Sequence, residues 1–245
     1  MYVKRTYCFP GSVEIEKLHT WKCRKKGQKR NKKSKPTPDT MKNYNLKKQT
    51  DYLRRLIKLN FPNGWHMVLT YDKNNRPDAA LAEKQLKNFL NRMRYHMRKA
   101  GYELKYIITT EYESKAIHHH VVIDDMPGLI RMAGKQWWHG QANFTAIYES
   151  GEVATLAEYL IKETDKTFRK SDVHGTRYSC SRNLEKPTYT EEIVKANTFR
   201  KDPVVPDGYV LERDSFVYGV SEVTGYEYQK YTLKKIINRT QKRRC

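Results

Sequence analysis

Three consecutive histidines form the most distinctive set of potential metal ligands in the sequence. His118, His119 and His120 lie in an apolar run, residues 117–124, that predicts a β-strand. Because side chains alternate across a strand, His118 and His120 share one face and His119 points to the other. Two imidazoles at this spacing can bind one metal ion, whereas a lone histidine on an apolar strand is usually structural.

The strand that precedes the histidines offers carboxylates to the same site. It is predicted over residues 104–113, and the short link 114–116 makes the two strands an antiparallel hairpin. Glu111 and Glu113 share a face, so either carboxylate can lie beside the histidine pair. Two imidazoles and one carboxylate leave open positions for water and substrate, as in catalytic metal sites. A hard ion such as Mg²⁺ or Mn²⁺ suits a site that holds phosphate oxygens.

A tyrosine and two lysines form a second potential catalytic group. Tyr159, Lys162 and Lys166 fall on one face of a helix predicted over residues 152–166. Nearby ammonium groups favour a phenolate and can stabilise the charge on a phosphate. Taken alone, the segment is explained more simply as an amphipathic helix with a surface tyrosine, because the chain has 18 tyrosines. The predicted buried stripe of this helix consists of Val153, Leu156, Ala157, Leu160 and Ile161.

The elements that must position these groups alternate along the chain. They are a strand at 65–71, a helix with Asp78 as its N-cap, strands at 104–113, 117–124 and 143–148, and a helix at 152–166. This order predicts an α+β fold in which helices pack on a central antiparallel sheet. Residues 2–18 have the alternation of a strand or short hairpin, and residues 40–60 predict a further helix.

The chain is strongly basic, with 48 Lys and Arg against 27 Asp and Glu in 245 residues and a net charge of +21. Such a charge attracts polyanions, of which nucleic acid is the commonest in cells. Residues 21–39 are nearly all basic or polar and predict a flexible loop. This loop is either a DNA-contacting arm that includes Lys25, Lys26 and Arg30, or a solvated linker. Charge alone does not distinguish an enzyme from a binding protein.

Cysteine usage and hydropathy favour a cytoplasmic protein. The four cysteines are scattered without the close pairs of a zinc ribbon, so reduced thiols are expected. The N-terminus lacks the apolar run of a signal peptide, and no segment approaches the ~20 apolar residues of a membrane span. No membrane partner is therefore expected. The glycine-rich P-loop pattern is absent, so no built-in helicase and no nucleotide cofactor are expected.

The order of the two groups resembles that of the HUH endonucleases, the initiators of rolling-circle replication. MVLTY at 67–71 resembles the first family motif, IHHHVVI at 117–123 the metal-binding motif, and YLIK at 159–162 the nucleophile motif. WHG at 138–140 and RYSCSRNLEKP at 177–187 are similar to the plasmid and filamentous-phage gene II type of replication protein. His119 departs from the metal-binding motif, whose middle position is usually bulky and apolar. The resemblance covers residues 60–187.

The resemblance implies roles for particular residues. His118, His120 and Glu111 would bind a divalent metal ion, Mg²⁺ or Mn²⁺. Tyr159 would be the nucleophile and Lys162 would assist it, and a single tyrosine at the motif implies one nucleophile per chain. Further DNA contacts are expected from Lys166, Arg177 and Arg182.

The resemblance also implies a domain organisation and a reaction. An RRM-like or ferredoxin-like sheet of about five strands would lie in residues 61–190. Residues 1–60 would be a basic N-terminal extension, and residues 191–245 either a C-terminal extension or the completion of the same domain. The implied substrate is single-stranded or hairpin origin DNA, nicked through a 5′-phosphotyrosyl intermediate. A host polymerase and a host helicase are the implied partners.

Three other functions fit parts of this pattern. A single-tyrosine transposase or relaxase would share the metal and tyrosine chemistry but act on different DNA. A metal-dependent phosphodiesterase that uses water would leave no covalent protein–DNA adduct. A non-catalytic nucleic-acid-binding protein would bind no stoichiometric Mn²⁺.

Overall fold

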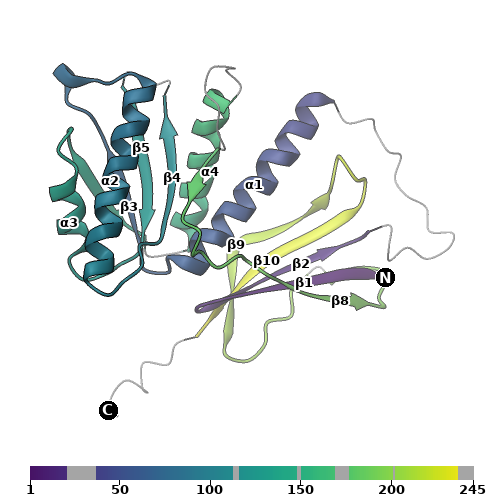
Figure 1. The fold of residues 1–245 in the computed structure, drawn as a ribbon. Coiled ribbons are helices and arrows are strands. Elements are labelled where there is room, and N and C mark those ends of the chain that lie inside the picture. Colours follow the sequence, from purple (N-terminus) through teal and green to yellow (C-terminus); the bar gives the residue numbers. More distant parts are fainter. Residues whose placement is uncertain (21–36, 113–115, 148–149, 169–176, 201, 237–245) are drawn as a thin grey trace, which may run out of the picture. The chain divides into compact units, whose positions relative to one another are not determined.

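The computed structural model describes residues 1–20, 37–112, 116–147, 150–168, 177–200 and 202–236, and it divides the chain into two compact units (Figure 1). One unit consists of residues 46–186, and the other combines residues 1–45 with 187–245. Glu113 and the basic residues Lys25, Lys26 and Arg30 lie outside the described residues, as does the side chain of Lys166. Their predicted roles therefore stay predictions.

The unit of residues 46–186 contains a five-stranded antiparallel sheet. Its strands have the spatial order β6-β3-β5-β4-β7. The strands are β3 (Trp65–Leu69), β4 (Tyr106–Glu111), β5 (His118–Ile123), β6 (Ala142–Ala146) and β7 (Ser179–Cys180). The helices are α1 (Pro38–Asn60, of which the last part belongs here), the short η2 (Lys73–Asn75), α2 (Ala79–Lys99), α3 (Leu129–Gln136) and α4 (Ser150–Phe168).

The chain path β3-α2-β4-β5-α3-β6 is the split βαβ arrangement of ferredoxin-like folds. It confirms the predicted α+β class and the predicted helix-covered antiparallel sheet. The cap predicted for the first helix of this path is also present, since the Asp78 side chain accepts a hydrogen bond of 2.7 Å from the backbone N–H of Leu81.

Each face of this sheet is covered by different helices (Figure 1). On one face, Met67 and Val121 pack with buried residues of α2 and α3. On the other face, Ile107 and Val122 pack with buried residues of α1 and α4. Because alternate residues of a strand point to opposite faces, two neighbouring residues of β5 enter two different environments.

Two glycines fix the ends of β3. A Cβ atom on Gly64, just before the strand, would lie 2.6 Å from the backbone oxygen of Ile123. A Cβ atom on Gly140 would lie 2.3 Å from the backbone oxygen of Thr70, just after the strand. Only a residue without a side chain permits approaches this close, so other backbone segments pack tightly next to both ends of β3.

The second unit is a separate five-stranded antiparallel sheet of order β8-β1-β2-β10-β9. Its strands are β1 (Tyr2–Phe9), β2 (Ser12–Leu18), β8 (Thr190–Val194), β9 (Tyr209–Val220) and β10 (Glu227–Lys235). The hairpin predicted over residues 2–18 is present. The N-terminal and C-terminal segments pair with each other in this sheet: Leu18, for example, lies opposite Tyr228. The C-terminal segment therefore does not complete the sheet that carries the histidines.

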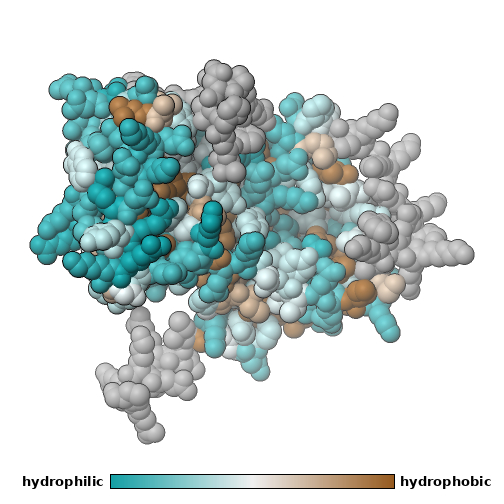
Figure 2. All heavy atoms as spheres, in the orientation of Figure 1, coloured by the Kyte–Doolittle hydropathy of each residue, from teal (hydrophilic) through white to brown (hydrophobic). Residues whose placement is uncertain are grey.

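One face of the molecule is mainly polar. On the face drawn in Figure 2, hydrophilic side chains predominate and hydrophobic ones are scattered in small groups. No helix in the described part of the chain is both long and apolar enough to span a membrane. Cys8 and Cys180 are free and exposed.

Candidate active site

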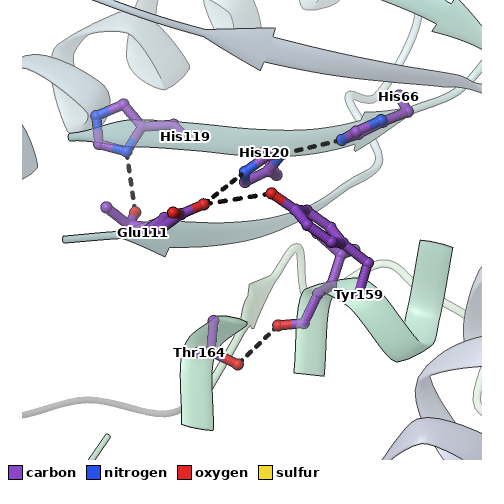
Figure 3. A network of polar contacts seen from close by, with 8 residues as sticks. His66, Glu111, His119, His120, Tyr159 and Thr164 are labelled. Carbon is purple, nitrogen blue, oxygen red and sulfur yellow. Dashed lines mark hydrogen bonds and ion pairs between the residues drawn. The ribbon is translucent and has the colours of Figure 1, made fainter. Parts of the chain in front are cut away.

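His119 lies on the α2 and α3 side of the sheet and is a structural residue. It is fully buried, with its Nε2 atom 2.8 Å from the Tyr71 hydroxyl and its Nδ1 atom 2.9 Å from the Thr110 hydroxyl. Burial, together with the neighbouring histidines, lowers the pKa of His119 to about 3. Both ring nitrogens thus have hydrogen-bond partners, and Figure 3 shows the ring pointing away from Tyr159. The alternation predicted for the histidine run is confirmed at this position.

His120 lies on the opposite face, beside Glu111 (Figure 3). In the strand register Thr109 is its direct neighbour on β4, and Glu111 reaches it diagonally, with 3.6 Å between His120 Nε2 and Glu111 Oε2. The His120 side chain is buried, and its Nε2 atom has no hydrogen-bond partner. Burial lowers the pKa of His120, an effect that the charge of Glu111 opposes.

His66 of β3 contacts the other nitrogen of His120, which the sequence did not predict. Its Nε2 atom lies 3.1 Å from His120 Nδ1, and the two rings stack with centroids 5.3 Å apart and planes 16° apart. Burial lowers the pKa of His66 to about 4. The presence of a histidine in the otherwise apolar run WHMVL could have marked His66 as a candidate site residue. Its contact with His120, however, depends on β3 lying next to β5.

Tyr159 joins this group from helix α4. Its hydroxyl donates a hydrogen bond of 3.3 Å to Glu111 Oε2, and its ring stands edge-on to His120 with centroids 5.3 Å apart. The side chain is 41% exposed, whereas the predicted stripe of α4 packs inward, with Val153, Ala157, Leu160 and Ile161 buried. The helix therefore holds its apolar face in the core and presents the phenol to the sheet (Figure 3).

Burial and two carboxylates raise the pKa of Tyr159. Burial is the largest cause that raises its pKa, followed by the negative charges of Glu111 and Glu163. Glu163 lies one helical turn after Tyr159 and was not singled out from the sequence. The expectation that Lys162 and Lys166 favour the phenolate stays a prediction, because the side chain of Lys166 lies outside the described residues. Burial and these carboxylates therefore favour the neutral phenol, and a positive charge beside it would oppose their effect on the pKa.

The other predicted site residues are described by their strand register, their exposure or a single hydrogen bond. His118 is half-buried and lies directly opposite Glu111 in the strand register. Lys162 is exposed on α4, and Arg182 is exposed after β7. Arg177 donates a hydrogen bond to the side chain of Gln49. Thus the structure brings Tyr159, Glu111 and His120 together and adds His66 to them.

A divalent metal ion fits this group in its chemistry. No three His, Cys, Asp or Glu residues in the described part of the chain are gathered as a complete metal site. His120 Nε2 is nevertheless a buried nitrogen without a hydrogen-bond partner, and it faces a carboxylate oxygen. An imidazole nitrogen and a carboxylate oxygen are both ligands of catalytic metal ions, and His118 shares their face by strand alternation.

The site thus lies in an α+β unit, where the sheet carries His120 and Glu111 and helix α4 carries Tyr159. Residues 64–168 match the model of a family of replication-associated proteins, the ORF2 and gene II protein family. The matched segment contains β3 through α4, and with them His66, Glu111, His120 and Tyr159. No curated protein and no solved structure matches the chain. The family match supports a replication-associated role of the Rep type.

Proposed function

We propose that the protein nicks and rejoins single-stranded origin DNA by transesterification and so initiates rolling-circle replication. The observation that carries this proposal is the contact between the Tyr159 hydroxyl and Glu111, next to His120, within the segment that matches a replication-associated family. A tyrosine hydroxyl beside a potential metal site is what a nucleophile for phosphoryl transfer needs.

His118, His120 and Glu111 would hold the divalent ion, Mg²⁺ or Mn²⁺. When bound, the ion would withdraw electron density from the scissile phosphate and offset the negative charge beside the phenol. The neutral imidazoles and the carboxylate would also keep the phosphate in one orientation relative to Tyr159. Lys162 would add positive charge from the same helix.

Tyr159 would attack the phosphorus atom in line with the leaving oxygen. A bond forms between Tyr159 Oη and phosphorus, and the bond between phosphorus and the 3′ oxygen breaks. The phenol proton is released to solvent, and the leaving 3′ oxygen takes a proton from solvent, so that the protons balance. The products are a 5′-phosphotyrosyl link and a free 3′-hydroxyl. Attack by a 3′-hydroxyl on this link rejoins DNA without ATP.

The partners follow from these products. The free 3′-hydroxyl is a primer that a host polymerase would extend, and a host helicase would unwind the duplex. The substrate is single-stranded or hairpin DNA, because the tyrosine needs an accessible backbone. The net charge of +21 supports binding to such a polyanion. A transposase or relaxase would use the same chemistry, and the DNA that is cut separates these functions.

A denaturing gel tests the proposal. The full-length protein is incubated with a labelled single-stranded and hairpin DNA library in Mn²⁺, beside Tyr159→Phe, His120→Ala and the control Tyr95→Phe, which alters an exposed tyrosine of α2. We expect a protein–DNA adduct that survives denaturation and that is absent only from the first two variants. An adduct in Tyr159→Phe would contradict the assigned nucleophile. Cleavage without any adduct would indicate a water-using phosphodiesterase.

A further inference from the structure

His66 is placed to control which nitrogen of His120 is available. The two rings are stacked, and His66 Nε2 faces His120 Nδ1 at 3.1 Å. The opposite nitrogen, His120 Nε2, is the buried atom that faces Glu111. A single imidazole thus connects a histidine partner on one side to the carboxylate on the other.

One proton must lie between the two facing nitrogens, because two lone pairs or two N–H groups at this distance would repel each other. If His66 carries that proton, neutral His120 is protonated at Nε2 and points an N–H group at Glu111. If His120 carries it at Nδ1, its Nε2 atom has a free lone pair. The two arrangements contain the same number of protons, but only the second allows Nε2 to bind a metal ion.

We propose that His66 is a positioning residue that accepts the Nδ1 proton of His120 and so holds its Nε2 lone pair toward a divalent ion. The proposal rests on the metal site of the proposed function. Histidines that bind metal usually donate their second N–H to a carboxylate, a carbonyl or water, which fixes the tautomer and the ring orientation. A neutral imidazole in that position fixes both without adding negative charge to the site.

Isothermal titration of the full-length protein with Mn²⁺ tests this role. His66→Phe keeps a stacking ring but removes the acceptor, and we expect about 10- to 100-fold weaker Mn²⁺ binding. His66→Gln offers an amide oxygen as acceptor, and we expect it to restore most of the affinity. His96→Phe alters a histidine of α2 and serves as the control. Thermal unfolding of each variant checks that the fold is kept.

The ¹⁵N NMR signals of His120 provide a second readout, which a purely structural role would not change. In the metal-free protein, we expect the proton on Nδ1 in the wild type and in His66→Gln, and a mixture of tautomers in His66→Phe. Wild-type Mn²⁺ affinity in His66→Phe would overturn the positioning role alone. Failure of the wild type to bind Mn²⁺ would overturn the metal site, and the positioning role with it.

A separate observation concerns the link between α3 and β6. Trp137 is buried and donates from Nε1 to the backbone oxygen of Thr70 at 2.8 Å. The next residue, Trp138, is instead 60% exposed. The guanidinium of Arg92 lies 3.8 Å from the centre of its ring, and this guanidinium also donates to the backbone oxygen of Gln136 at 3.0 Å. The indole of Trp137 therefore anchors the link to the backbone just after β3, and the indole of Trp138 lies at the surface against the guanidinium of Arg92.

We infer that Trp138 is a stacking platform for an unpaired base of single-stranded DNA, an inference that also rests on the proposed function. An exposed aromatic ring stacks on any base, and each such contact contributes about 1–3 kcal/mol. Arg92 supplies a positive charge where the phosphate backbone would pass, and it holds the indole in place at little entropic cost. The net charge of +21 favours this polyanion over an apolar partner.

Fluorescence anisotropy with a labelled oligo-dT at fixed salt tests the platform, in a Tyr159→Phe background that prevents covalent capture. We expect Trp138→Ala to weaken binding about 5- to 100-fold and Trp138→Phe to restore most of it. The control is Tyr95→Ala, because Tyr95 is a similarly exposed aromatic residue of α2. Unchanged binding in Trp138→Ala would overturn the platform alone, and would leave a protein partner as the occupant of this surface. No binding by the background protein would also contradict the proposed function.

Discussion

His119 and His120 are adjacent in β5, yet their surroundings differ in kind. Both ring nitrogens of His119 have hydroxyl partners within the core. His120 has a ring partner at one nitrogen and a facing carboxylate, without a hydrogen bond, at the other. His119 is thus explained by its place in the fold, whereas the unpartnered Nε2 atom of His120 is the one that the proposed function assigns to the metal ion.

The largest expected effect is that of a substitution at His120, the histidine with an unpartnered nitrogen. His120→Ala should lower adduct formation by at least about 100-fold, since changes in residues behind a metal ligand already cost 10- to 100-fold. Its free energy of unfolding should also fall, because the buried ring packs against His66 and Tyr159, so the rates are compared for the folded protein. Initial rates on the labelled DNA and urea unfolding measure the two effects. A large loss of stability with unchanged rates would reverse the assignment.

For His119, whose two ring nitrogens both have hydrogen-bond partners, a substitution should affect stability and not the reaction. His119→Ala removes a fully buried ring and leaves the hydroxyls of Tyr71 and Thr110 without it, so the free energy of unfolding should fall by about 2–4 kcal/mol. Adduct formation by the remaining folded protein should stay within a few-fold of the wild type. The measurement is urea unfolding, followed by activity at low temperature. An inactive but fully stable His119→Ala protein would break the comparison.

The burial of His119 should also make the stability of the protein depend on pH. The folded-state pKa of His119 is about 3, and that of an unperturbed histidine is about 6.5. The unfolded state therefore binds the proton first, so stability is complete above pH 6.5 and falls as the pH is lowered below it. Each such group contributes a slope of roughly 1.4 kcal/mol per pH unit. His119→Gln should show a shallower fall between pH 6.5 and 4 in urea unfolding. An unchanged slope would show that His119 is not the titrating group.

The smallest expected effect concerns the phenol. Glu111→Gln and Glu163→Gln should each lower the pKa of Tyr159, because both carboxylates raise it, and the Glu111 variant should do so more. Glu111 contributes a hydrogen bond as well as its charge. Titration of the ¹³C NMR signal of Tyr159 in the metal-free protein measures this order. A higher pKa in either variant would contradict the electrostatic account of the site.

The sequence predicted the parts of the site that depend on local geometry. The alternation of His119 and His120, the inward stripe of α4 and the Asp78 cap all follow from periods of two or 3.6 residues within one element. The short link that makes β4 and β5 a hairpin placed Glu111 or Glu113 beside the histidines, and the family resemblance favoured Glu111. Glu163 was missed because only cations were considered as neighbours of Tyr159.

Contacts between distant segments were not predictable in this way. His66 meets His120 only because β3 lies beside β5, and no local pattern specifies that strand order. The second sheet depends on pairing such as that of Leu18 with Tyr228, which lie more than 200 residues apart. The alternation of β2 and β10 indicates strands but not their partners.

The glycines at the two ends of β3 have a consequence for how this protein tolerates insertions and deletions. Gly64 and Gly140 leave no room for a side chain against the neighbouring backbone, so the five-residue strand lies between two positions that accept only glycine. A one-residue insertion between Gly64 and His66 would turn His66 to the opposite face of the sheet. Laboratory evolution should therefore accept exchanges of side chains within β3 far more readily than any change in its length.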